Sequence, residues 1–195
     1  MSKRKFEYQD FVLKNKIEAI FDSEDKKRRR YFLSLPFSDE PKNPILVILK
    51  NPSIANKQES DNSVNRILKY IHKHLRQFDK VNITNLFVYC CSKSKYINPA
   101  IDKFGEDYVV GNKLGDKYNN DKILINEIKK ASKIIVAYGN SNGIDKDLYK
   151  NRVNFIKRLL KNKDVIYINK LSKNDKHPFH AAYWSINMMY FKFKI

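Results

Sequence analysis

The sequence contains few of the residues that build turn-rich, cross-linked or membrane-spanning proteins. It has 5 glycines and 6 prolines in 195 residues, too few for the dense turns of an all-β barrel or sandwich. Its two cysteines, Cys90 and Cys91, are adjacent, which excludes a disulfide framework and a clustered zinc site. No apolar run approaches the ~18 residues that cross a bilayer. We therefore expect a reduced, cytoplasmic protein with no cofactor, no metal and no membrane partner.

The sequence does contain enough apolar material for a core. Hydrophobic residues make up 42% and aromatic residues 13% of the chain, more than a disordered chain carries. A chain of this length buries roughly 70% of its unfolded surface when it folds. We expect one domain over residues 1–195, with residues 1–28 as an N-terminal extension, and a monomer.

Positive charge is in excess. Lysine and arginine total 39 against 21 aspartates and glutamates, a net charge of +18, and residues 151–195 hold 10 basic and 2 acidic side chains. This favours a polyanion such as DNA as partner, because each neutralised phosphate releases counterions. A lysine-rich composition typical of an AT-rich genome is the alternative. The run Lys26-Lys27-Arg28-Arg29-Arg30 can likewise be a phosphate-contacting patch or a solvated loop edge.

Apolar runs alternate with helical patterns along the chain. Continuous β-branched and leucine runs predict strands over residues 31–35, 44–49, 81–88, 134–138 and 165–168. Apolar residues at spacings of three and four predict helices over 64–75, 123–131 and 148–160. This order predicts a three-layer α/β/α sandwich with a short, mostly parallel central sheet. In such sheets ligands bind beyond the carboxyl ends of the strands.

Polar residues stand at the ends of the first two predicted core strands. Pro52 holds Asn51 extended, so that its amide can orient a water or a ligand; an ordinary Asn-Pro turn is the alternative. Asn85 interrupts an apolar strand, where a buried amide matches a base edge or bonds neighbouring backbone. Asp61 is the one carboxylate placed where a general base is wanted.

The third predicted strand ends in Tyr138-Gly139-Asn140. The glycine allows a tight turn or the close approach of a ligand. The sequence has no GxGxxG or phosphate-loop pattern, which argues against a dinucleotide or nucleoside triphosphate site.

After the last predicted strand come two histidines three residues apart, His177 and His180. Lys173 and Lys176 precede His177, and Phe179 lies between the histidines. This group can neutralise an anion and stack on bases. As a metal site it is weak, because no third ligand has local spacing.

In their order along the chain, these features resemble a bacterial and phage family, domain of unknown function 1643. The resemblance covers about residues 29–185. Its marks are Arg30-Tyr31-x-Leu33, Leu49-x-Asn51-Pro52-Ser53-x-Ala55, Asp61 with Arg66, Asn85-Leu86-Phe87, Gly111 followed by Asn120-Asp121, Tyr138-Gly139 and His177-Pro178.

At a greater distance the same layout resembles the uracil-DNA glycosylase superfamily, which has a three-layer α/β/α fold with a short parallel sheet. The resemblance implies that Asn51, helped by Asp61, positions the attacking water. It implies that Asn85 reads the edge of a base taken out of the DNA stack, and that His177 stabilises charge on the departing base. The further residues that it places at the base are Pro52, Ser53, Phe87 and Tyr138, and those at the DNA are Gly139, Asn140, Lys173, Lys176, Phe179 and His180.

The resulting expectation is a DNA-binding protein that excises or recognises an altered base, without a cofactor or metal. Two alternatives stay open. The chain can be a catalytically silent protein that binds single- or double-stranded DNA, or an enzyme that acts on a modified nucleotide, with its charge attracting phosphate.

Overall fold

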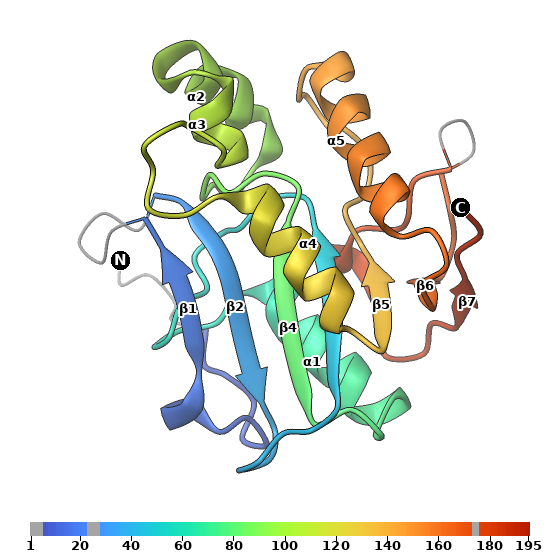
Figure 1. Cartoon of the computed structure of the whole chain (residues 1–195). Helices are drawn as coiled ribbons and strands as arrows, with labels where there is room; N and C mark the ends of the chain where they lie inside the picture. Colours follow the sequence, from blue (N-terminus) through green and yellow to red (C-terminus); the bar gives the residue numbers. More distant parts are fainter. Residues whose placement is uncertain (1–5, 23–27, 173–175) are drawn as a thin grey trace.

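A seven-stranded mixed sheet runs through the computed structural model, which describes residues 6–22, 28–172 and 176–195 (Figure 1). The order of strands across the sheet is β1-β2-β4-β3-β5-β6-β7. The bounds are Glu18–Phe21 for β1, Arg30–Pro36 for β2, Pro44–Leu49 for β3, Lys80–Asn85 for β4, Lys133–Val136 for β5, Val165–Ile168 for β6 and Tyr190–Lys192 for β7. The five strands predicted from apolar runs are thus present as β2 to β6.

The expectation of a mostly parallel sheet is wrong. The three pairings among β4, β3, β5 and β6 are parallel, whereas β1 with β2, β2 with β4 and β6 with β7 are antiparallel. The connection from β2 to β3, residues 37–43, contains no helix. A parallel crossover needs about a dozen residues or more, so this short link returns the chain in the opposite direction.

Helices cover both faces of the sheet, as Figure 1 shows with α1 behind the strands and α4 and α5 in front. The three helices predicted from apolar spacing are confirmed as α1, α4 and α5. The α-helices span Asn62–His74 (α1), Ile97–Phe104 (α2), Glu106–Val110 (α3), Asn120–Lys130 (α4) and Lys146–Leu159 (α5), and 3₁₀ turns span Lys14–Lys16, Ser94–Tyr96 and Ala181–Tyr183.

Each face of the sheet has its own apolar core. Along β3, Val47 and Leu49 pack in the core on the α1 side, while Leu46 and Ile48 pack in the core shared with α4 and α5. This alternation follows from the two-residue period of a strand. A strand buried on both faces reads as the continuous apolar run seen in the sequence.

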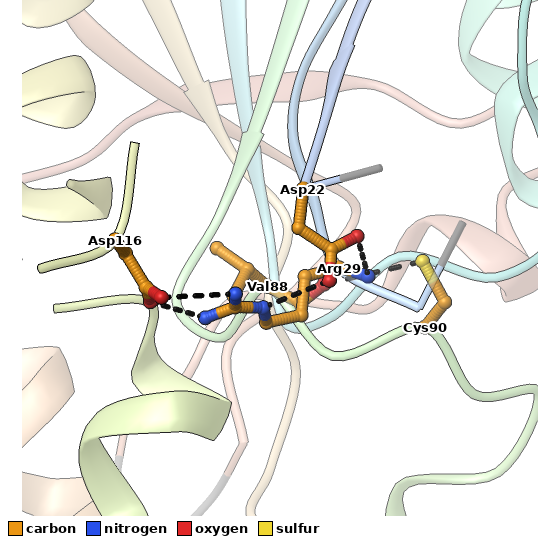
Figure 2. Close-up of polar contacts among 5 residues, drawn as sticks. All are labelled: Asp22, Arg29, Val88, Cys90 and Asp116. Atoms are coloured by element: carbon orange, nitrogen blue, oxygen red, sulfur yellow. Dashed lines mark hydrogen bonds and ion pairs between the residues drawn. The ribbon is translucent and has the colours of Figure 1, made fainter. Parts of the chain in front are cut away.

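In the arginine run Arg28 is exposed, whereas Arg29 and Arg30 are buried and so form no solvated edge. Arg29 donates to the carboxylates of Asp22 and Asp116 (Figure 2). Its guanidinium carbon lies 4.0 Å from the centroid of the Tyr108 ring. This clamp joins the strand edge to the loop before α4. Residues 26 and 27 of the run lie outside the described residues.

Candidate functional site

The ends of several strands meet at one edge of the sheet. Strands β3 and β4 end as ladder partners at Leu49 and Asn85. Strand β2 runs the other way, so Arg30, its first residue, lies at the same end. We call this region the carboxyl edge; it is formed by Arg30 and by residues 50–53, 85–87, 138–140 and 177–180.

Asn85 is fully buried at this edge. Its backbone carbonyl accepts a hydrogen bond from Nδ2 of Asn120 at 3.2 Å. Neither Nδ2 nor Oδ1 of the Asn85 side chain has a hydrogen-bond partner among the described residues. A buried amide without partners costs free energy, so this side chain is placed to receive a ligand or a water.

Arg30 is 1% exposed and is not paired with a carboxylate in the described part of the chain. Nη1 donates to the carbonyl of Ala55 at 2.7 Å, and Nε is buried without a partner there. The β1–β2 ladder changes register next to Arg30: Ile20 pairs with Phe32, whereas the following residue, Phe21, pairs with Arg30. Strands β2 and β4 are neighbours, so the edge carries a guanidinium beside the strand that holds the Asn85 amide.

Lys50 directly follows β3 and is 1% exposed. Its side chain makes neither a hydrogen bond nor an ion pair with any residue that the structure describes; its Nζ lies 5.9 Å from the ring centroid of Tyr149 on α5. Burial lowers the pKa of the Lys50 ammonium to about 8, and the nearby Cys91 opposes this only in part. Lys50 is therefore a buried cation for which the described residues provide no counter-ion.

Tyr149, Gly139 and His180 complete the surroundings of Lys50. The Tyr149 hydroxyl donates to the carbonyl of Gly139. Gly139 has φ +70°, and a Cβ added there would lie 2.9 Å from Cβ of His180, so only glycine allows this close approach. Burial and the charge of Lys50 lower the pKa of His180 to about 4, so its imidazole is neutral at pH 7.

The ring of His177 lies between those of Tyr149 and Tyr138 in a chain of aromatic contacts. The ring of His177 is 5.3 Å from that of Tyr149 and 6.2 Å from that of Tyr138, both edge to face. Tyr138 is fully buried, and its hydroxyl lacks a partner within the described residues. Four residues predicted from the third and last strand ends are thus linked by contacts to Tyr149, directly or through one neighbour: Tyr138, Gly139, His177 and His180.

Asn51 is tied to a neighbouring loop. Its Nδ2 donates to the carbonyls of Cys91 at 2.8 Å and Pro52 at 3.0 Å, and its Oδ1 accepts from Oγ of Ser94 at 3.5 Å. Pro52 is buried and Ser53 half-buried. The amide is therefore fixed in orientation, with its oxygen only weakly engaged.

Asp61 acts as the N-cap of α1. Its Oδ1 accepts the backbone N–H of Val64 at 2.8 Å, the usual arrangement at a helix start. Between the side chains of Asn51, Asn85 and His177, the described residues show no hydrogen bond. Each belongs to a different set of contacts on the carboxyl edge.

Comparison with protein families gives one finding. The family described as "Protein of unknown function (DUF1643)" matches residues 30–181. The chain belongs to this family. Neither the curated proteins nor the solved structures contain a match to the chain.

Two of the residues on which the resemblance to this family rests, Asn120 and Asp121, take part in hydrogen bonds that hold the backbone at the end of β4. Asn120 donates to the carbonyl of Asn85, and Asp121 accepts from Nη2 of Arg152 at 2.7 Å. Nε of the same arginine donates to the carbonyl of Leu86 at 3.1 Å. These hydrogen bonds hold the backbone of Asn85 and Leu86 in place, and so help to position the Asn85 side chain.

The other predicted contact residues are spread in exposure. Phe87 is fully buried in the core on the α4 and α5 side. Phe179 is half-buried, with its carbonyl accepting from Nε1 of Trp184 at 3.2 Å, while Asn140 and Lys176 are exposed. Lys173 lies outside the described residues.

A cavity of about 450 Å³ opens beside α5. Tyr149 and His177 form part of its wall. The charged residues that line it are Lys146, Asp147, Lys150 and Lys157. The cavity is therefore basic and adjoins the tyrosine that lies over Lys50.

The described residues contain neither a metal-binding cluster nor a membrane-spanning helix. They contain no group of three histidine, cysteine, aspartate or glutamate side chains that could hold a metal ion. None of their helices combines the length and apolarity needed to cross a membrane.

Sequence reasoning missed Arg30, Lys50 and Tyr149 as site residues. Lys50 lies in one of the predicted strand-end segments, but the sequence of this segment does not reveal that the side chain is buried with no counter-ion among the described residues. Arg30 is hidden in a basic run, and Tyr149 in an ordinary helical pattern. The available signal was position alone: Lys50 directly follows an apolar strand.

Proposed function

We propose that this protein binds DNA at the carboxyl edge and recognises a nucleobase with the side chain of Asn85. The observation that carries the proposal is the fully buried Asn85 amide, whose donor and acceptor both lack a partner among the described residues. A base edge presents a complementary donor and acceptor side by side. Because the amide is buried, the base must leave the stack and enter the protein.

The charge of the protein supports a nucleic acid as the carrier of that base. The net charge is +18, and three lysines line the cavity beside α5. Arg30 adds a buried guanidinium without a carboxylate partner in the described chain. Such groups hold phosphates and position a duplex or strand without reading its sequence.

A second candidate function is excision of the base, as the likeness to the uracil-DNA glycosylase superfamily implies. Asn51 favours it, because its amide is fixed by Cys91 and Pro52 while its oxygen can still accept from a water. In this reaction the water oxygen bonds to C1′ of the sugar as the bond from C1′ to the base breaks. The base leaves with the bonding electrons as an anion, whose charge His177 stabilises, and it then takes up the proton that the attacking water gives up. Asp61 has no chemical step here, since it caps α1.

Fluorescence anisotropy with labelled oligonucleotides at several salt concentrations tests the binding. We expect affinity to fall steeply with salt, and Asn85→Ala to lose discrimination among bases while keeping the salt dependence. Asn82→Ala is the matched control, because its amide already bonds Ser34 and Glu127 inside the protein. An affinity that does not change with salt would refute the proposal.

Excision is tested with oligonucleotides that carry uracil and other altered bases, followed by alkali to break abasic sites. We expect breaks with the native chain and a loss of at least tenfold in Asn51→Ala and His177→Ala. His72→Ala, on the exposed side of α1, is the control for histidine removal. Intact strands across the panel, with specific binding retained, leave recognition without excision.

A further inference from the structure

We infer that Lys50 is the inner anchor of a phosphate subsite, where its ammonium binds an oxyanion carried by the ligand. The inference deepens the proposed function and rests on it only for the nucleotide nature of that ligand. Nothing in the family match assigns Lys50 a role.

The first argument is the contrast between Lys50 and other buried basic residues. Arg29 is paired with Asp22 and Asp116, and Arg152 with Asp121. The Lys50 side chain is just as buried and has neither an ion pair nor a hydrogen bond with a described residue. A buried charge is tolerated only when it is paired, so the ammonium needs an anion that the described residues do not supply.

The second argument is the chemistry around the ammonium. Its described neighbours are the ring face of Tyr149, the neutral imidazole of His180 and the thiol of Cys91. Burial raises the pKa of Cys91 to about 12, so this thiol carries no negative charge at pH 7. The surroundings can therefore accept an anion without repelling it.

The third argument is the basic cavity that shares Tyr149 with the surroundings of Lys50. Tyr149 lies over Lys50 and also lines the 450 Å³ cavity. Lys146, Lys150 and Lys157 stand along that cavity, against one acidic residue, Asp147. The three lysines along the cavity, together with the buried Lys50, favour a ligand group that carries more than one negative charge. Phosphate is such a group, and a lysine ammonium binds it as a point charge.

Thermal unfolding in inorganic phosphate, with chloride balancing ionic strength, tests the subsite. We expect phosphate to raise the melting temperature of the native chain by about 4 °C or more at saturation. Lys50→Met should need at least tenfold more phosphate for the same rise. Lys129→Met removes an exposed lysine of α4 and should respond like the native chain. An equal rise in Lys50→Met, or no rise in the native chain, would overturn the inference.

A second measurement needs no variant. Reductive methylation of the native chain, followed by peptide mass spectrometry, reports the reactivity of each lysine. We expect phosphate to slow modification of Lys50 several-fold and to leave Lys129 unchanged. Equal rates at Lys50 with and without phosphate would contradict the subsite.

The source of the phosphate is resolved by comparing inorganic phosphate, a deoxynucleoside 5′-monophosphate and an oligonucleotide in the same assay. Loss of all three responses in Lys50→Met, with the phosphate response intact in Asn85→Ala, supports the subsite whatever the fate of base recognition. Oligonucleotide binding that is lost in Asn85→Ala and unchanged in Lys50→Met rejects the subsite and keeps the proposed function.

Discussion

Three polar side chains, Arg30, Lys50 and Asn85, lie at the carboxyl edge where packing alone would favour apolar ones. Each is at most 1% exposed. The Arg30 side chain donates one hydrogen bond, to the carbonyl of Ala55, and the side chains of the other two make none with described residues. Such positions lower the stability of the free protein, and they are expected where a ligand supplies the missing partners.

The first prediction concerns Asn85. Asn85→Leu keeps the branched shape of the side chain and removes a buried amide that has no partner among the described residues, so we expect the free energy of unfolding to rise by about 1 kcal/mol while base discrimination is lost. Urea denaturation and oligonucleotide binding measure the two effects. Asn82→Leu, which breaks bonds to Ser34 and Glu127, should instead destabilise the fold. A destabilised Asn85→Leu would argue against the unpartnered amide.

The second prediction concerns Lys50 in alkali. Its pKa is about 8 in the fold and ordinarily 10.5, so the unfolded chain binds more protons between these values and Lys50 adds stability as pH rises through that window. Lys50→Met should be more stable than the native chain at pH 7 by up to roughly 3 kcal/mol. The gap should close toward pH 10.5. Urea denaturation at pH 7, 9 and 10.5 measures it, and a constant gap would contradict the buried ammonium.

The third prediction concerns His180 in acid. Its pKa is about 4 in the fold and ordinarily 6.5, so the neutral form is favoured and its contribution is lost as pH falls from 6.5 to 4. We expect His180→Gln to reduce the acid-induced loss of stability by roughly 2–3 kcal/mol. The comparison is made by urea denaturation at pH 7 and pH 4.5, with His72→Gln as control. Parallel losses in all three proteins would contradict the prediction.

At the scale of elements, the sequence predicted what buried periodicity reveals. The apolar runs of β3 and β5 and the spacing of Val64, Ile67 and Ile71 in α1 depend only on burial, which the residue types record. Strands β1 and β7 are short and partly exposed, and α2 contains a proline, so their patterns are weak. Strand direction depends on the length of connections, which apolar runs do not encode.

The candidate site was predictable only in part for the same reason. Asn85 stood out because an amide interrupts an apolar strand, and Gly139 because it follows one. The lack of a counter-ion at Lys50 depends on which side chains tertiary packing brings near it. That information is absent from residue spacing.

The fourth prediction concerns the turn after β5. Gly139→Ala combines φ +70° with a Cβ 2.9 Å from that of His180, so we expect a loss of about 2–4 kcal/mol in the free energy of unfolding. Gly115→Ala has a similar φ of +85° with no atom within 4 Å of the new Cβ, and should lose about 1 kcal/mol. Urea denaturation of the two variants separates strain from close contact. Equal losses would show that His180 yields to the new methyl group.

At the scale of the whole molecule, the charge of +18 acts over longer distances than any contact at the edge. It speeds association with a polyanion and is screened by salt. The Arg29 clamp holds one guanidinium and two carboxylates, a net charge of −1, so burying it leaves the positive excess on the rest of the chain.

The reversal of β2 joins distant parts of the chain at one place, since Arg30 and His180 both belong to the carboxyl edge. A ligand held there would connect the first half of the sequence to the last. Amide hydrogen exchange should then slow in β2 and in β6 together when an oligonucleotide is added, rather than in one of them. Slowing confined to β6 would mean that the ligand leaves the reversed strand untouched.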